Sequence, residues 1–92
     1  MEEIINLKKK QLNNLMNEID QKLELLDYED FIIAVEDYNK VKNGYYKTLS
    51  DITTTPLTTI ILSLDTTYGA LMEFNDRICS IYNLQTGVLR AA

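Results

Sequence analysis

The hydrophobic pattern is strongest between Pro56 and Gln85. Apolar residues recur there every seventh position, with others three or four positions further on: Leu57, Leu64, Leu71 and Ile78, then Ile60, Ile61, Tyr68, Phe74, Ile81 and Tyr82. This spacing predicts a helix of about eight turns, roughly 45 Å long, with one broad apolar face. Thr55 and Pro56 suit its start, because threonine caps free N–H groups and proline's fixed φ fits the first turn.

Two shorter amphipathic segments precede this helix. In residues 2–26 the apolar positions have helical spacing: Ile5, Leu12, Leu15, Met16, Ile19, Leu23 and Leu26. A second apolar set follows Asp27: Tyr28, Phe31, Ile32, Val35 and Tyr38. At about 100° per residue the two sets point roughly 145° apart, so one helix could not bury both on the same neighbour. We therefore expect a break with Asp27 as the N-cap of a second helix; one long helix that touches two partners is the alternative.

The second helix is expected to span residues 28–50. Asn43-Gly44 is a helix stop or a turn signal, but Tyr46 and Leu49 keep the apolar side of the helix if it continues. A kink at Gly44 or Gly69 is allowed, since glycine is unfavourable inside a helix. Residues 51–55 are the expected linker. The sequence thus predicts one all-α domain over residues 1–92, a three-helix antiparallel bundle with helices at about 2–26, 28–50 and 56–85.

Composition limits the kind of partner. Apolar residues make up 46% and charged residues 25% of the chain, as in folded globular proteins. The net charge of −5 argues against direct nucleic-acid binding and favours a protein partner with a basic surface. Cys79 is the only cysteine, no apolar run reaches the roughly 20 residues of a membrane span, and the N-terminus lacks a basic signal-peptide region. We expect a cytoplasmic protein with no membrane contact.

Residues that could perform catalysis are scarce. The chain has no histidine, and its three glycines are too scattered to form a phosphate-binding loop. Cys79 has no basic neighbour other than Arg77, so a buried apolar role is expected for it rather than a reactive thiol. We expect no enzymatic activity, no cofactor and no metal site.

Three groups of residues are candidates for partner contacts. Glu29, Asp30, Glu36 and Asp37 lie on the side of the second helix opposite its apolar set; they form an acidic face for a basic partner or an ordinary solvated face. Leu62, Gly69, Met72 and Cys79 lie on the outer side of the third helix and are a candidate homo-oligomer contact or isolated exposed residues. Tyr45 and Tyr46 cannot both point inward. We expect Tyr46 in the core and Tyr45 as an exposed aromatic anchor.

The sequence favours a non-enzymatic acidic helical protein that masks or inhibits a partner, for example a phage-type inhibitor of a host or defence protein. The alternative is a structural or assembly subunit that homo-oligomerises through its long helices. The third helix is longer than its neighbours, for which roughly 38 Å and 34 Å are expected, so it should extend beyond the bundle near Ile78 to Leu84. This extension is a further place to expect a second chain.

Overall fold

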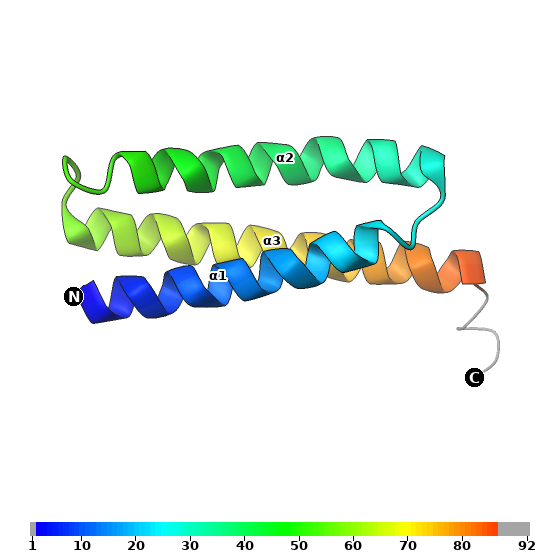
Figure 1. The fold of residues 1–92 in the computed structure, drawn as a ribbon, viewed down its shortest axis with the longest axis horizontal. Helices are drawn as coiled ribbons and strands as arrows, with labels where there is room; N and C mark the ends of the chain where they lie inside the picture. The colour runs from blue at the N-terminus through cyan, green and yellow to red at the C-terminus, as the bar shows by residue number, and fades with distance from the viewer. Residues whose placement is uncertain (1, 87–92) are drawn as a thin grey trace.

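The computed structural model describes residues 2–86, with side chains for residues 2–82, and contains three helices. They are α1 (Glu2–Leu23), α2 (Tyr28–Ser50) and α3 (Leu57–Thr86), and the described residues contain no strand (Figure 1). The predicted all-α three-helix fold is confirmed. The bounds of α2 and α3 agree with the expected ones to within one residue, whereas α1 ends three residues earlier than expected.

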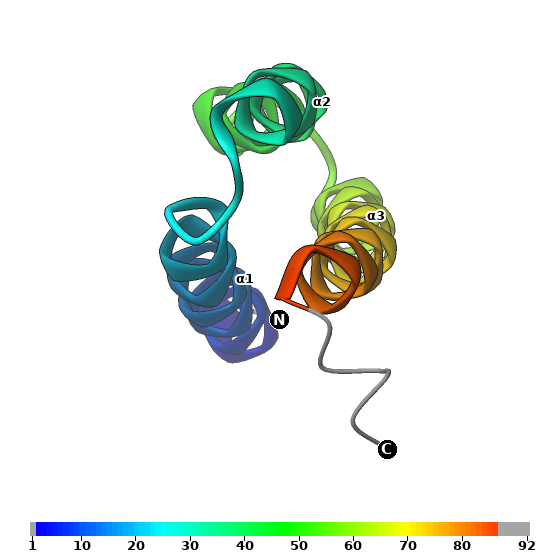
Figure 2. The ribbon, with the colours of Figure 1, turned by 90° about the vertical axis from the view of Figure 1, so that its right-hand side faces the viewer.

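The helices run back and forth along the long axis of the molecule. In Figure 1, α1 and α3 run in the same direction and α2 runs in the opposite direction. α3 packs against both other helices along its length, whereas α1 and α2 contact each other only slightly. The end-on view shows the three helices at the corners of a triangle (Figure 2). α3 is therefore the helix on which the other two assemble.

The chain breaks between α1 and α2, as the phase of the apolar residues predicts. The amides of Leu25 and Leu26 donate to the carbonyls of Lys22 and Leu23 at 3.0 and 3.2 Å, which closes α1 with a turn. Asp27 is the N-cap residue of α2, with extended backbone angles (φ −62°, ψ 155°), although the cap contains no side-chain hydrogen bond. The alternative of a single helix is wrong.

The core is a continuous apolar cluster along the bundle. Its buried members are Ile5, Leu12, Leu15, Met16, Ile19, Leu23, Leu26, Ala34, Tyr38, Tyr45, Ile60, Leu64, Leu71, Phe74 and Ile78. Tyr38 connects all three helices, because its ring stacks on Phe74 at 5.5 Å between centroids and its hydroxyl donates to the Met16 carbonyl at 3.1 Å. The expected apolar faces of α1 and α3 therefore supply most of the core.

The expected apolar face of α2 is only partly correct. Tyr38 is buried, but Tyr28 and Ile32 are exposed, and Ala34 and Tyr45 are buried in their place. The reason is the small contact between α1 and α2, which leaves one flank of α2 uncovered. The buried strip of α2 therefore faces α3 and the part of α1 that Tyr38 and Tyr45 contact.

The glycines do not end either helix. α2 continues through Gly44 and α3 through Gly69, and a Cβ atom added to either residue would meet no atom within 4 Å. The residues that follow α2 turn back through a hydrogen bond from the Thr55 amide to the Asp51 carbonyl, at 3.0 Å. Ile52 packs against the core from this linker.

We predict that Gly69→Ala raises the free energy of unfolding by about 1 kcal/mol. Alanine is the better helix former by this amount, and the added methyl group has free space. A rise of about 4–8 °C in the midpoint of thermal unfolding, followed by circular dichroism, would be the corresponding shift. Ala70→Gly at the neighbouring position is the inverse control and should lower the midpoint. A lower midpoint for Gly69→Ala would contradict the prediction.

Candidate functional site

Charge is distributed unevenly along the bundle. Residues 18–39 and 72–82 occupy one end, where the turn between α1 and α2 meets the second half of α3 (Figure 1). We call this the acidic end. Lys22 donates to Asn75 at 2.9 Å there, and Tyr38 stacks on Phe74, so these segments lie at the same level.

The acidic end holds ten carboxylates and two cations, a net charge of −8. The carboxylates are those of Glu18, Asp20, Glu24, Asp27, Glu29, Asp30, Glu36, Asp37, Glu73 and Asp76, and the cations are Lys22 and Arg77. Residues 2–17 and 40–71 form the opposite end, with four carboxylates and six lysines, a net charge of +2. The two ends of the molecule therefore differ strongly in charge, and the net charge of −5 alone does not reveal this difference.

The four residues of the predicted acidic face do not lie in one row along α2. Asp30 and Asp37 line a groove between α2 and α3, whereas Glu29 and Glu36 do not and are exposed. Each glutamate precedes an aspartate by one position, so the two rows are about 100° apart around the helix. Glu36 pairs with Lys40 at 3.9 Å on the exposed surface.

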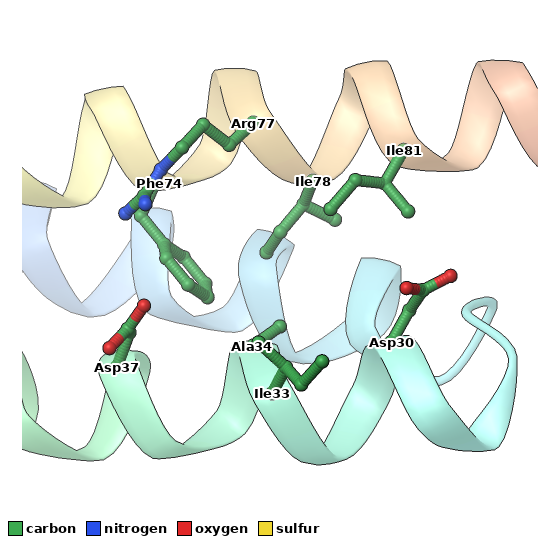
Figure 3. Close-up of a pocket in the computed structure, with 8 residues that line it drawn as sticks. All are labelled: Asp30, Ile33, Ala34, Asp37, Phe74, Arg77, Ile78 and Ile81. Carbon is green, nitrogen blue, oxygen red and sulfur yellow. The ribbon is translucent and has the colours of Figure 1, made fainter.

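The α2–α3 groove contains a cavity of about 90 Å³ (Figure 3). Asp30, Ile33, Ala34 and Asp37 line it from α2, and Phe74, Arg77, Ile78 and Ile81 line it from α3. Ala34 and Ile78 are buried at its floor. The cavity lies where the short side chain of Ala34 faces α3, because an alanine cannot fill the space between the helices. Charged groups from both helices surround this apolar floor.

Of the residues whose side chains are described, Arg77 is the only cation that lines this cavity. Its guanidinium carbon lies 5.6 Å from the centroid of the Phe74 ring, a cation–π contact that covers the ring. Asp30 and Asp37 are two helical turns apart, about 10 Å along α2. The groove therefore presents apolar surface between separated charges.

The predicted contact residues of α3 are mostly exposed. Leu62, Gly69 and Met72 face solvent in the single chain, and Cys79 is half-buried. Met72 and Tyr68 also line a depression next to α1. Whether this side of α3 contacts another chain stays a prediction.

The expected roles of Tyr45 and Tyr46 are reversed. Tyr45 is 1% exposed and its hydroxyl donates to Asn13 Oδ1 at 3.5 Å, whereas Tyr46 is 50% exposed. Tyr45 follows the buried Tyr38 by seven residues and therefore lies on the same side of α2, and Tyr46 is turned about 100° away. This spacing was the sequence signal for the correct assignment. Tyr45 is not an exposed anchor.

The expected extension of α3 is also partly wrong. Ile78 is buried against α2, because the first turns of α2 reach this level of α3. Ile81 is partly buried against the same core. The side chain of Leu84 lies outside the described residues, so its part of the prediction is not tested.

Two buried tyrosines are the ionisable groups most affected by the fold. Burial, and then the neighbouring Asp20 carboxylate, raise the pKa of Tyr38, and burial raises the pKa of Tyr45. The side chains of residues 2–82 contain no group of three or more metal-binding residues. None of the helices, as far as they are described, is both long and apolar enough to cross a membrane.

Comparison with known proteins does not assign the chain to a family. No family model, curated protein or solved structure matches it. The function must therefore be inferred from the arrangement of its residues.

Proposed function

We propose that the protein is a non-enzymatic binding protein that masks a basic surface of a partner protein with its acidic end. The observation that carries this proposal is the net charge of −8 on one end of the bundle, against +2 on the other. An acidic surface attracts and orients a basic partner and raises the association rate. The same charge opposes binding to a nucleic-acid backbone.

Exposed apolar residues at the same end support a protein partner. Leu25, Tyr28, Ile32 and Ile33 are all exposed, and they cluster around the first turns of α2. Protein interfaces combine such apolar groups with a charged rim, whereas a site for small cations would need only converging oxygens. Masking a partner in this way also fits the inhibitor expected from the sequence.

The test begins with capture from an extract of the native host on immobilised protein, with mass spectrometry to identify what binds. The affinity of the captured protein is then measured for Glu29→Lys/Glu36→Lys, which reverses the exposed row of the acidic end. We expect at least a tenfold lower affinity, mainly through slower association, and a strong decrease with added salt.

The matched control is Glu2→Lys/Glu3→Lys, which makes the same charge change at the opposite end of the bundle. Its affinity should stay within about twofold of the unaltered protein. An equal loss of affinity in both variants, or an affinity that added salt does not lower, would contradict the proposed role of the acidic end.

The alternative function, a structural subunit that homo-oligomerises, is favoured by the exposed side of α3. Leu62 and Met72 are apolar and face solvent there. Light scattering on the purified chain tests it, because a mass of 10.6 kDa at every concentration would exclude a stable assembly.

A further inference from the structure

The surface of α2 beside α3 is complementary to itself. A row of residues spaced alternately by three and four positions runs along it: Asp30, Ile33, Asp37, Lys40, Gly44 and Lys47. This is the spacing of the contact positions in two-stranded coiled coils. We call the row from Asp30 to Lys47 the α2 seam. Its acidic members lie in the first half and its lysines in the second.

We infer that a second copy of this chain docks on the α2 seam, with the two α2 helices antiparallel and related by a twofold axis. The axis passes through the midpoint between Tyr38 and Asn39. This register pairs Asp30 with Lys47, Ile33 with Gly44 and Asp37 with Lys40 of the second copy, and each pair occurs twice. Such reciprocity is what a twofold interface requires, because residue i contacts j and j contacts i.

Charge complementarity supports this occupant. Two carboxylates and two lysines of each copy meet their opposites, so four ion pairs form across the seam. Among the described residues, Lys40 and Lys47 make no close ion pair that the dimer would have to break. The pair between Lys40 and Glu36 is long, 3.9 Å, and both side chains are more than two-thirds exposed. Exposed pairs of this kind contribute little to stability.

Shape complementarity supports the same register. Ile33 is 67% exposed, which makes it the protruding apolar residue of the seam (Figure 3). Gly44 lies at the same distance on the other side of the axis and lines a depression of about 250 Å³ together with Thr48, Thr59 and Ser63. Since a Cβ atom at Gly44 would meet nothing within 4 Å, the space above it is open. Ile33 of one copy can enter the depression beside Gly44 of the other.

Three residues of the acidic end, Asp30, Ile33 and Asp37, belong to the seam. Glu29 and Glu36 are outside it, and the other carboxylates of the acidic end remain available to a basic partner. The antiparallel arrangement also places the acidic end of each copy beside the positive end of the other, which favours association through the overall charge as well. The interface involves few apolar residues, so we expect a weak dimer that dissociates on dilution and in high salt.

Sedimentation velocity of the full chain over a range of concentrations tests the dimer. We expect a monomer–dimer equilibrium whose dissociation constant rises at least tenfold between low and high salt. Ile33→Ser should raise the dissociation constant of the dimer at least tenfold. Ile32 is the adjacent isoleucine; it is 44% exposed and lies outside the seam, so Ile32→Ser should leave the dissociation constant within about twofold. A monomer at every concentration and at low salt would overturn the inference.

Two further pairs of variants test the register. Gly44→Leu should abolish the dimer by filling the depression, and Gly69→Leu, which adds the same group at an equally open helical glycine, should not. Asp37→Lys alone should weaken the dimer, and the exchange Asp37→Lys/Lys40→Asp should restore it, because the paired charges stay opposite. Loss of the dimer with Gly69→Leu only, or no rescue by the exchange, would overturn the seam. Binding of a basic partner protein is measured separately with Glu29→Lys/Glu36→Lys, which changes no residue of the seam, so the two proposals can fail independently.

Discussion

Replacing Leu71 with alanine is expected to lower the free energy of unfolding by about 2–5 kcal/mol. Leu71 is 0% exposed and lies near the middle of α3, the helix on which both others pack. Removing its side chain loses buried apolar area and leaves a cavity that the neighbouring helices cannot fill. Since small domains are stable by only about 5–15 kcal/mol, this change removes a large part of the total. Denaturation by urea, followed by circular dichroism, measures it.

Leu62→Ala is the matched control for this prediction. It makes the same substitution in the same helix, but Leu62 is 67% exposed, so the effect should stay within about 0.5 kcal/mol. Similar losses for the two variants would show that Leu71 does not lie in the core. The contrast therefore tests the orientation of α3 in the bundle.

The second large effect is a loss of stability in alkaline solution. The pKa of Tyr38 is raised above its ordinary value of about 10, mainly by burial, and the pKa of Tyr45 is raised by burial as well. The folded state therefore keeps these protons at pH values where the unfolded state loses them. Stability is fully present below about pH 10 and falls above it, by up to about 1.4 kcal/mol per pH unit for each tyrosine. Unfolding by urea at a series of pH values measures the slope.

Tyr38→Phe should make this alkaline loss shallower. At neutral pH the variant should be less stable by about 0.5–1.5 kcal/mol, because the hydrogen bond to the Met16 carbonyl is lost. Tyr28→Phe removes the same hydroxyl from an exposed position and is the control. If the slope above pH 10 is the same in Tyr38→Phe as in the unaltered protein, ionisation of Tyr38 is not its cause.

The sequence predicts the helices well because the signals that define them are local. The sevenfold repeat through Leu64 and Leu71 fixes the buried side of α3 regardless of its partners. The phase change at Asp27 likewise requires a break, since no single neighbour could cover both apolar sets. These features depend on residues within a few turns of each other, so periodicity alone reveals them.

The buried side of α2 could not be predicted in the same way. Tyr28 and Ile32 are as apolar as the residues that the fold buries, and only the position of α1 decides which flank is covered. The acidic face is a similar case, because its division into Asp30 and Asp37 beside α3, and Glu29 and Glu36 away from it, follows from how α2 is rotated. The difference in charge between the two ends of the bundle also arises only on folding, because segments far apart in the sequence form each end.

The small contact between α1 and α2 has a consequence for how the chain folds. In a bundle built from successive hairpins, most tertiary contacts join nearby segments of the sequence. Here the α1–α3 interface joins residues such as Lys22 with Asn75 and Lys8 with Asp65, which are 53 and 57 positions apart. These contacts can form only after the intervening segment closes into a loop, at a cost in conformational entropy that grows with its length. The barrier to folding therefore includes the closure of this loop.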